Sequence, residues 1–114
     1  MIIKKLVDAP SFELTGMPHV KKRIILGPSE GSKEIVLRYF SLEAGGATPH
    51  HTHDFPHLIK VEYGEGQVLD QYDHAHPLQA GDYIYINSNE THKLKNTGEE
   101  PFEFICIVPG RGES

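Results

Sequence analysis

The chain carries eight histidines in 114 residues, and five of them fall between His50 and His74. Neutral imidazole is the commonest protein ligand for transition metals, so this clustering predicts a metal site. His51 and His53 are two residues apart, and on an extended strand they lie on one face, about 7 Å apart at Cα. Two imidazoles placed in this way can converge on one metal, with bonds near ~2.1 Å. His50 has the opposite parity, and it and His19 are expected to face solvent.

His57 follows this pair, but a straight strand would carry it about 13 Å beyond His53, too far to share the metal. Residues 54–56, Asp-Phe-Pro, can form a turn, and proline is poorly accommodated in a central strand. If the chain folds back there, His57 opens the next strand facing His51 and His53, and the hairpin supplies three nitrogen ligands. The alternative is that His57 lies over the pocket as a proton carrier.

His92 repeats this arrangement farther along the chain. Residues 82–86 are a strand-like run, the Asn-rich segment 87–91 is typical of a turn, and His92 begins the next run. We therefore expect His92 to be the fourth ligand. His74 and His76 also form a His-x-His pair, but they lie at an expected hairpin tip with no third ligand nearby, so they are expected at the surface.

Short β-rich runs separated by Gly, Pro, Asn and Asp predict an all-β sandwich or barrel, and no segment has a helical pattern of useful length. The expected strands are residues 20–26, 34–43, 58–63, 67–72, 82–86, 92–95 and 102–108. Alternation puts Arg38 on one face with Val36, and Phe104 on one face with Cys106. The run 20–26 is too apolar for a free edge, so it pairs within the barrel or with a second subunit.

Composition limits the partners and the compartment. The formal net charge is −5, and Lys21–Arg23 is the only basic run, which we interpret as a solvated strand edge rather than a nucleic-acid site. No segment approaches the roughly 20 apolar residues of a membrane span, and the N-terminus lacks a signal-peptide pattern. Cys106 is the single cysteine, so no internal disulfide can form, and a cytoplasmic location is expected. No linker divides the sequence, which predicts one domain over residues 1–114.

Two segments resemble the motifs of the cupin family. Residues 45–64 fit the first motif, Gly-x5-His-x-His-x3-Glu-x6-Gly, except that His57 stands where glutamate is usual. Residues 81–96 are similar to the second motif, Gly-x5-Pro-x-Gly-x2-His-x3-Asn, with Asn87 and Asn89 in the proline and glycine positions. The resemblance implies a single cupin domain, a double-stranded β-helix or jelly-roll barrel, which forms a homodimer with a metal inside its mouth.

The exchange of glutamate for histidine narrows the resemblance to small single-domain cupins with four histidine ligands, some of which bind manganese. It implies a site formed by His51, His53, His57 and His92. Affinity order alone would favour copper, nickel or zinc on nitrogen ligands. The resemblance ranks manganese first and iron second, and nickel, copper and zinc stay open. Four neutral imidazoles leave the charge of a divalent metal unreduced, which favours a carboxylate or enolate beside it.

Three further residues are candidates for the substrate pocket. Cys106 has the pattern of a small buried hydrophobe, and the resemblance also places it near the metal, with Phe104 as pocket wall. Arg38 is either an anion anchor inside the barrel or an outward residue with a packed stem. We expect a metal-dependent oxidoreductase of the dioxygenase type, acting on a small organic substrate. Two alternatives stay open: a non-redox isomerase of a small hydroxy-carbonyl compound, and a non-catalytic module that binds a small ligand or metal.

Overall fold

The computed structural model describes residues 1–113, and these form antiparallel β-strands joined by turns. The strands are β1 (Phe12–Leu14), β2 (Met17–Leu26), β3 (Ile35–Leu42), β4 (His57–Tyr63), β5 (Glu65–Leu69), β6 (Ala75–Gln79), β7 (Tyr83–Ile86), β8 (Lys93–Asn96) and β9 (Phe102–Pro109). The helical elements of this part of the chain are the short 3-10 turns η1 (Leu6–Asp8), η2 (Pro28–Glu30) and η3 (Gly110–Glu113). Within residues 1–113, no helix is long and apolar enough to cross a membrane.

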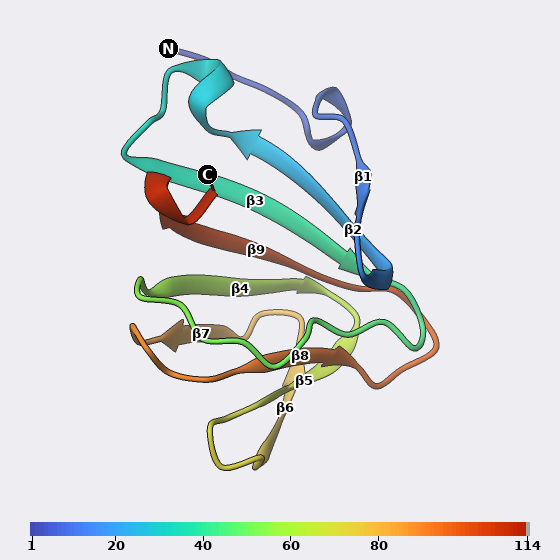
Figure 1. Cartoon of the computed structure of the whole chain (residues 1–114). Coiled ribbons are helices and arrows are strands. Elements are labelled where there is room, and N and C mark those ends of the chain that lie inside the picture. The colour runs from blue at the N-terminus through green and yellow to red at the C-terminus, as the bar shows by residue number, and fades with distance from the viewer. Residues whose placement is uncertain (114) are drawn as a thin grey trace.

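The strands form two sheets that enclose one interior. The larger sheet has the order β1-β2-β3-β9-β4-β7, and the smaller has the order β6-β5-β8. Figure 1 shows β2, β3, β9 and β4 side by side, with β8 and β5 beneath β4. The ends of the chain therefore meet in one sheet, because β9 lies between β3 and β4.

Strict alternation explains how the large sheet builds its core. Every second residue of β3, from Val36 to Leu42, is buried, and the same holds for β9 from Phe102 to Val108. The two strands pair without a bulge, so Phe40 stands opposite Phe104 and their rings stack at 5.3 Å. The apolar core comprises Val20, Val36, Phe40, Leu42, Phe55, Ile59, Val61, Leu78, Ile86, Leu94, Phe102, Phe104, Cys106 and Val108.

The segment between β3 and β4 runs back along β8 and closes one side of the barrel. Thr48 is bonded to this strand through its main chain and its side chain: its N–H donates to the Leu94 carbonyl at 2.9 Å. The Thr48 hydroxyl also accepts from the Leu94 N–H at 2.9 Å. Farther along, His51 and His92 form an antiparallel bridge. This pairing brings the histidines of the first motif beside the histidine of the second.

The predicted strands are confirmed in type and in order, with shifted ends and two additions. The run 20–26 pairs within the chain, where β2 lies between β1 and β3, so it does not need a second subunit. The short strand β1 was not predicted. The second addition is β6, so the expected hairpin tip at His74 and His76 is wrong for His76, because β6 begins at Ala75 and includes His76 and Pro77. Pro77 fits there because β6 is an edge strand, where a missing N–H costs little.

Candidate metal centre

Three histidines come together inside the barrel. The side-chain nitrogens of His51, His53 and His92 that could serve as ligands all lie within 4.8 Å of one another. The ring of His51 is 4.4 Å from that of His53 and 4.6 Å from that of His92, measured between centroids. Nitrogens at this spacing can converge on one metal ion with bonds near ~2.1 Å. The group therefore has the dimensions of a metal site.

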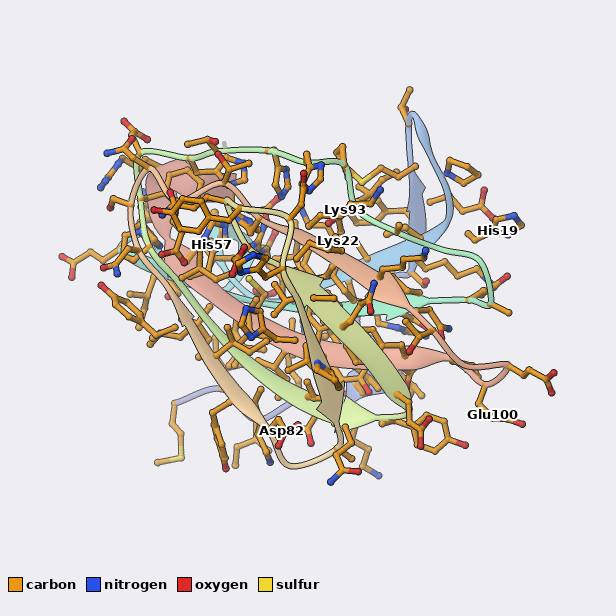
Figure 2. All side chains as sticks on the ribbon, turned by 90° about the horizontal axis from the view of Figure 1, so that it is seen from below. His19, Lys22, His57, Asp82, Lys93 and Glu100 are labelled. Atoms are coloured by element: carbon orange, nitrogen blue, oxygen red, sulfur yellow. The ribbon has the colours of Figure 1, made fainter. Side chains whose placement is uncertain are left out.

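His57 lies beside this group, as the first residue of β4. Its ring centroid is 5.0 Å from that of His53 and 4.9 Å from that of His92. The turn at residues 54–56 thus returns the chain as expected, and Figure 2 shows His57 toward the interior of the barrel, whereas His19 projects from its rim. His57 is not part of the compact three-nitrogen group, so the geometry brings three of the four predicted ligands together and leaves the fourth adjacent.

The surroundings of the rings leave nitrogens available for a metal. His92 Nδ1 lies 2.9 Å from the Glu90 carbonyl oxygen. Because a carbonyl only accepts, Nδ1 carries the proton and Nε2 keeps its lone pair. The Nδ1 atoms of His53 and His57 are buried and have no hydrogen-bond partner within residues 1–113. Buried polar atoms are usually satisfied, so these orphaned nitrogens fit a site that receives a metal or a polar ligand.

Burial keeps the cluster neutral. Desolvation, with the neighbouring His92, His53 and Arg38 charges adding to it, lowers the pKa of His57 to about 3. Desolvation and the His92 charge lower the pKa of His51 to about 4. Desolvation likewise lowers the pKa values of His53 and His92. A ligating imidazole must be unprotonated, so these side chains are ready to bind a metal at neutral pH.

The histidines line a cavity of about 250 Å³ that has a largely apolar wall. Phe40 and Phe104 stack in this wall, and Ile59 adds to it. Arg38 and Cys106 stand opposite each other on β3 and β9, and Arg38 Nη2 lies 2.9 Å from Cys106 Sγ. The three residues predicted for the pocket therefore all line the cavity, and Arg38 points inward rather than outward. Burial raises the pKa of the Cys106 thiol, so the sulfur stays protonated at neutral pH.

Lys22 also lines the cavity, and it was not predicted from the sequence as a pocket residue. The run Lys21–Arg23 was interpreted as a solvated edge, which is wrong for Lys22, because its side chain lines the cavity and pairs with Glu113. Its parity was the available signal, since Lys22 shares a face with the buried Val20. Figure 2 shows Lys22 turned toward the middle of the barrel. Glu113 gave no sequence signal, because η3 has no periodic pattern.

The remaining histidines lie outside the cavity. His50 is exposed, and its Nε2 lies 3.2 Å from Asp73 Oδ1. His76 Nε2 lies 2.9 Å from Asp70 Oδ2, and His74 Nδ1 lies 3.9 Å from the same oxygen. All three rings are at least two-fifths exposed, which confirms their expected place at the surface.

Comparison with known proteins settles the family. Residues 38–108 match the cupin domain family, and this stretch includes His51, His53, His57 and His92 and most of β3 and β9. The chain belongs to the cupin family. The predicted all-β cupin barrel is therefore confirmed.

The cupin is similar to proteins with different names. It is 26% identical over 116 residues to auxin-binding protein 1 of Arabidopsis thaliana, an alignment that covers 94% of this chain and 58% of that protein. It is 27% identical over 78 residues to the oxalate-binding protein of Thermotoga maritima, covering 68% of this chain and 64% of that protein. The chain thus spans about three-fifths of the length of these curated relatives.

Its fold also matches a solved enzyme. The polyketide cyclase RemF from Streptomyces resistomycificus superposes with a TM-score of 0.91 at 21% identity, over 96% of this chain and 80% of that one. Identity at this level speaks for the shared barrel alone. The different functions in these names agree with the rule that activity on a common fold is decided by the site.

Proposed function

We propose that this cupin is a metal-dependent oxidoreductase of the dioxygenase type, which acts on a small organic substrate in the barrel cavity. The observation that carries the proposal is the three-histidine group, with ligand nitrogens within 4.8 Å of one another, facing a cavity of about 250 Å³. No side-chain arrangement within residues 1–113 pairs a nucleophile with its own base there, so a bound metal is assigned the difficult chemistry.

The proposed ligands are His51, His53 and His92, with His57 as the fourth. A bound manganese or iron ion would supply Lewis acidity and redox chemistry, with manganese ranked first and nickel, copper and zinc open. The protein holds the imidazoles neutral by burying them, and the hydrogen bond from His92 Nδ1 to the Glu90 carbonyl orients that ring. Four neutral ligands leave the metal charge unreduced, which supports an anionic substrate.

The other cavity residues have proposed roles in binding. Phe104 and Phe40 offer an apolar surface that excludes water and holds the body of a small molecule. Arg38 offers a buried positive charge, and Cys106 fixes one of its guanidinium nitrogens at 2.9 Å. A small-molecule partner, a homodimeric assembly and a cytoplasmic location also belong to this proposal.

Metal content is the first test. The protein is purified from cells grown with balanced metals, and its metals are measured by mass spectrometry beside a His51→Ala variant and a His50→Ala control. We expect about one manganese or iron per chain, lost in His51→Ala and kept in His50→Ala, because His50 is exposed and bonded to Asp73. Metal that is unaffected by His51→Ala would contradict the site.

Oxygen uptake is the second test. The manganese and iron forms are assayed with enolic, phenolic and alkene substrates in an oxygen electrode. Substrate-dependent oxygen consumption supports the dioxygenase proposal. Turnover that persists with zinc and without oxygen would replace it by isomerase chemistry, and tight binding of a ligand without turnover would replace it by a binding module.

A further inference from the structure

Two positive side chains are buried in the wall of the metal cavity. Lys22 lies on the inward face of β2 and is 9% exposed, and Arg38 lies on the inward face of the neighbouring β3 and is 8% exposed. Lysine and arginine are almost never this buried unless they are paired. Both line the cavity together with the histidines.

One carboxylate from η3 serves both cations. Glu113 Oε1 lies 3.2 Å from Arg38 Nη1, and Glu113 Oε2 accepts from Lys22 Nζ. The Glu113 side chain is 10% exposed, so its carboxylate is inside the barrel rather than on its surface. Each oxygen has its own cationic partner, which is the arrangement in which two donors recognise a carboxylate.

The charges in this wall do not balance. Among residues 1–113, Lys22 and Arg38 contribute two positive charges to it and Glu113 contributes one negative charge. Arg38 Nε is buried and has no hydrogen-bond partner within residues 1–113. Uncompensated buried charge is costly, so a purely structural network would be expected to complete its pairing. The surplus charge and the free donor instead leave capacity for an anion.

The element that carries Glu113 is attached to the barrel mainly by polar contacts: the Gly110 N–H donates to the Glu34 carbonyl at 2.9 Å, and the Arg111 guanidinium donates to the Asp54 carbonyl at 3.1 Å. None of the four residues of η3 is buried, although the segment borders the cavity at Gly112. A side chain at position 112 would come within 2.7 Å of the Phe55 ring, so this glycine lets η3 lie against the cavity wall. A short element with little buried surface opens at low free-energy cost. Because η3 lies outside the strands and none of its residues is buried, displacement of Glu113 requires no strand to unpair.

We infer that Lys22 and Arg38 form a binding subsite for the carboxylate of a small molecule with an apolar body, and that Glu113 is its internal occupant, displaced when the ligand binds. The apolar body lies against Phe40 and Phe104, which border the same cavity. The inference rests on the proposed function only where it identifies the bound carboxylate as a substrate. The subsite itself consists of side chains and requires no metal.

Benzoate is a suitable probe, because it joins a carboxylate to an apolar ring. Benzamide has a similar shape but no charge, so it serves as the neutral control. Binding is measured by calorimetry on the full chain, both as purified and after treatment with a chelator. We expect benzoate to bind in both forms and benzamide to bind at least about tenfold more weakly, as charged hydrogen bonds require. Equal binding of the two compounds would overturn the inference.

Three variants and a control locate the subsite. Lys22→Gln and Arg38→Gln should each weaken benzoate binding about tenfold to hundredfold, because each removes a charged donor. Glu113→Gln should tighten it about tenfold, because an internal competitor at millimolar effective concentration is removed. Lys21→Gln is the control, since Lys21 lies on the other face of β2 and pairs with Glu43. Its affinity should equal that of the wild type, and an unchanged affinity in Glu113→Gln would overturn the inference.

A second measurement needs no variant. In the wild-type chain, we expect benzoate to change the chemical shift of the Gly112 amide in the NMR spectrum, because η3 moves when Glu113 is displaced. Benzamide should leave this chemical shift unchanged. Benzoate binding without any change at Gly112 contradicts the displacement of Glu113. These results are independent of the metal analysis, so the subsite and the proposed metal function can fail separately.

Discussion

His51 and His92 exchange both of their backbone hydrogen bonds. The His51 N–H donates to the His92 carbonyl at 3.1 Å, and the His92 N–H donates to the His51 carbonyl at 3.0 Å. Residues paired in this way across antiparallel segments carry their side chains on the same face. The main chain thus sets the separation of two histidines that are far apart in sequence. His53 lies two residues after His51 on an extended segment, so its side chain is on the same face.

Changes at His57 should distinguish a fourth ligand from a bystander. We expect His57→Glu to keep about one metal ion per chain, because a carboxylate is also a metal ligand, and His57→Ala to be substoichiometric after dialysis. Metal content by mass spectrometry measures both. If His57→Ala retains a full complement of metal, His57 is not a ligand, and its role as a proton carrier gains support.

The metal-free protein should lose stability as the pH falls. The pKa of His57 is about 3 in the folded chain, below its ordinary value near ~6.5, so the unfolded chain binds a proton that the folded chain excludes. Between these pH values, the free energy of unfolding should fall by about 1.4 kcal/mol per pH unit for this histidine alone. Urea unfolding at pH 7, 6, 5 and 4 measures the slope.

Two variants test the source of that slope. His57→Gln cannot titrate, so its free energy of unfolding should depend less steeply on pH than that of the wild type. His19→Asn is the matched control, because His19 is exposed and has a positive φ of 67° that asparagine tolerates. Identical slopes for His57→Gln and the wild type would rule out His57 as the group responsible.

Asn96 should be a large contributor to stability. Its Nδ2 donates to the carbonyls of Leu42 and Glu100, both at 2.8 Å, and its Oδ1 accepts from the Gly98 N–H at 2.8 Å. Asn96→Ala removes all three bonds from a buried position, and we expect a loss of about 2–3 kcal/mol in the free energy of unfolding. The exposed Asn87→Ala should change it by less than about 0.5 kcal/mol in the same urea titration.

The outer face of the large sheet should form the contact of the predicted homodimer. Ile107 of β9 pairs with Leu37 on one side and Leu58 on the other, and Leu58 pairs in turn with Tyr85. Leu58 is 53% exposed and Tyr85 is 59% exposed, so the row offers apolar surface to a second copy. Leu58→Lys should shift the protein to a monomer in sedimentation velocity experiments.

A control on another surface makes that result specific. Tyr72→Lys changes an exposed residue at the β5–β6 turn, away from the large sheet, and should leave the sedimentation coefficient unaltered. A wild-type chain that sediments as a monomer at all concentrations would show the homodimer prediction to be wrong.

Much of the barrel could be predicted because the local alternation of apolar residues agrees with the burial of one face of each strand in the folded chain. Val36 and Phe104 belong to strands whose alternation matches one buried face, so these strands follow from the residues themselves. The i, i+2 spacing of His51 and His53 likewise sets a shared face, and Pro56 signals the turn that returns His57. Backbone parity and turn chemistry were sufficient there.

Other features depend on partners that are distant in sequence. Lys22 has the composition of a solvated run, and its burial becomes favourable only because Glu113 meets it from the other end of the chain. His76 lies in an edge strand that contains Pro77, a residue that argues against a strand when sequence is considered alone. Parity places Lys22 on the face of Val20, but the ion pair with Glu113 and the edge position of β6 have no local signature and could not be predicted.

The insertion of β9 between β3 and β4 also governs when the histidine group can exist. A chain emerging from synthesis holds His51, His53 and His57 before it holds His92 or the central strand of its own large sheet. Strand pairs this far apart in sequence form late, because the entropic cost of closing a long loop is incurred before the stabilising contacts between the strands can form. We therefore expect the histidine cluster, and with it the proposed metal site, to form only when the barrel is complete.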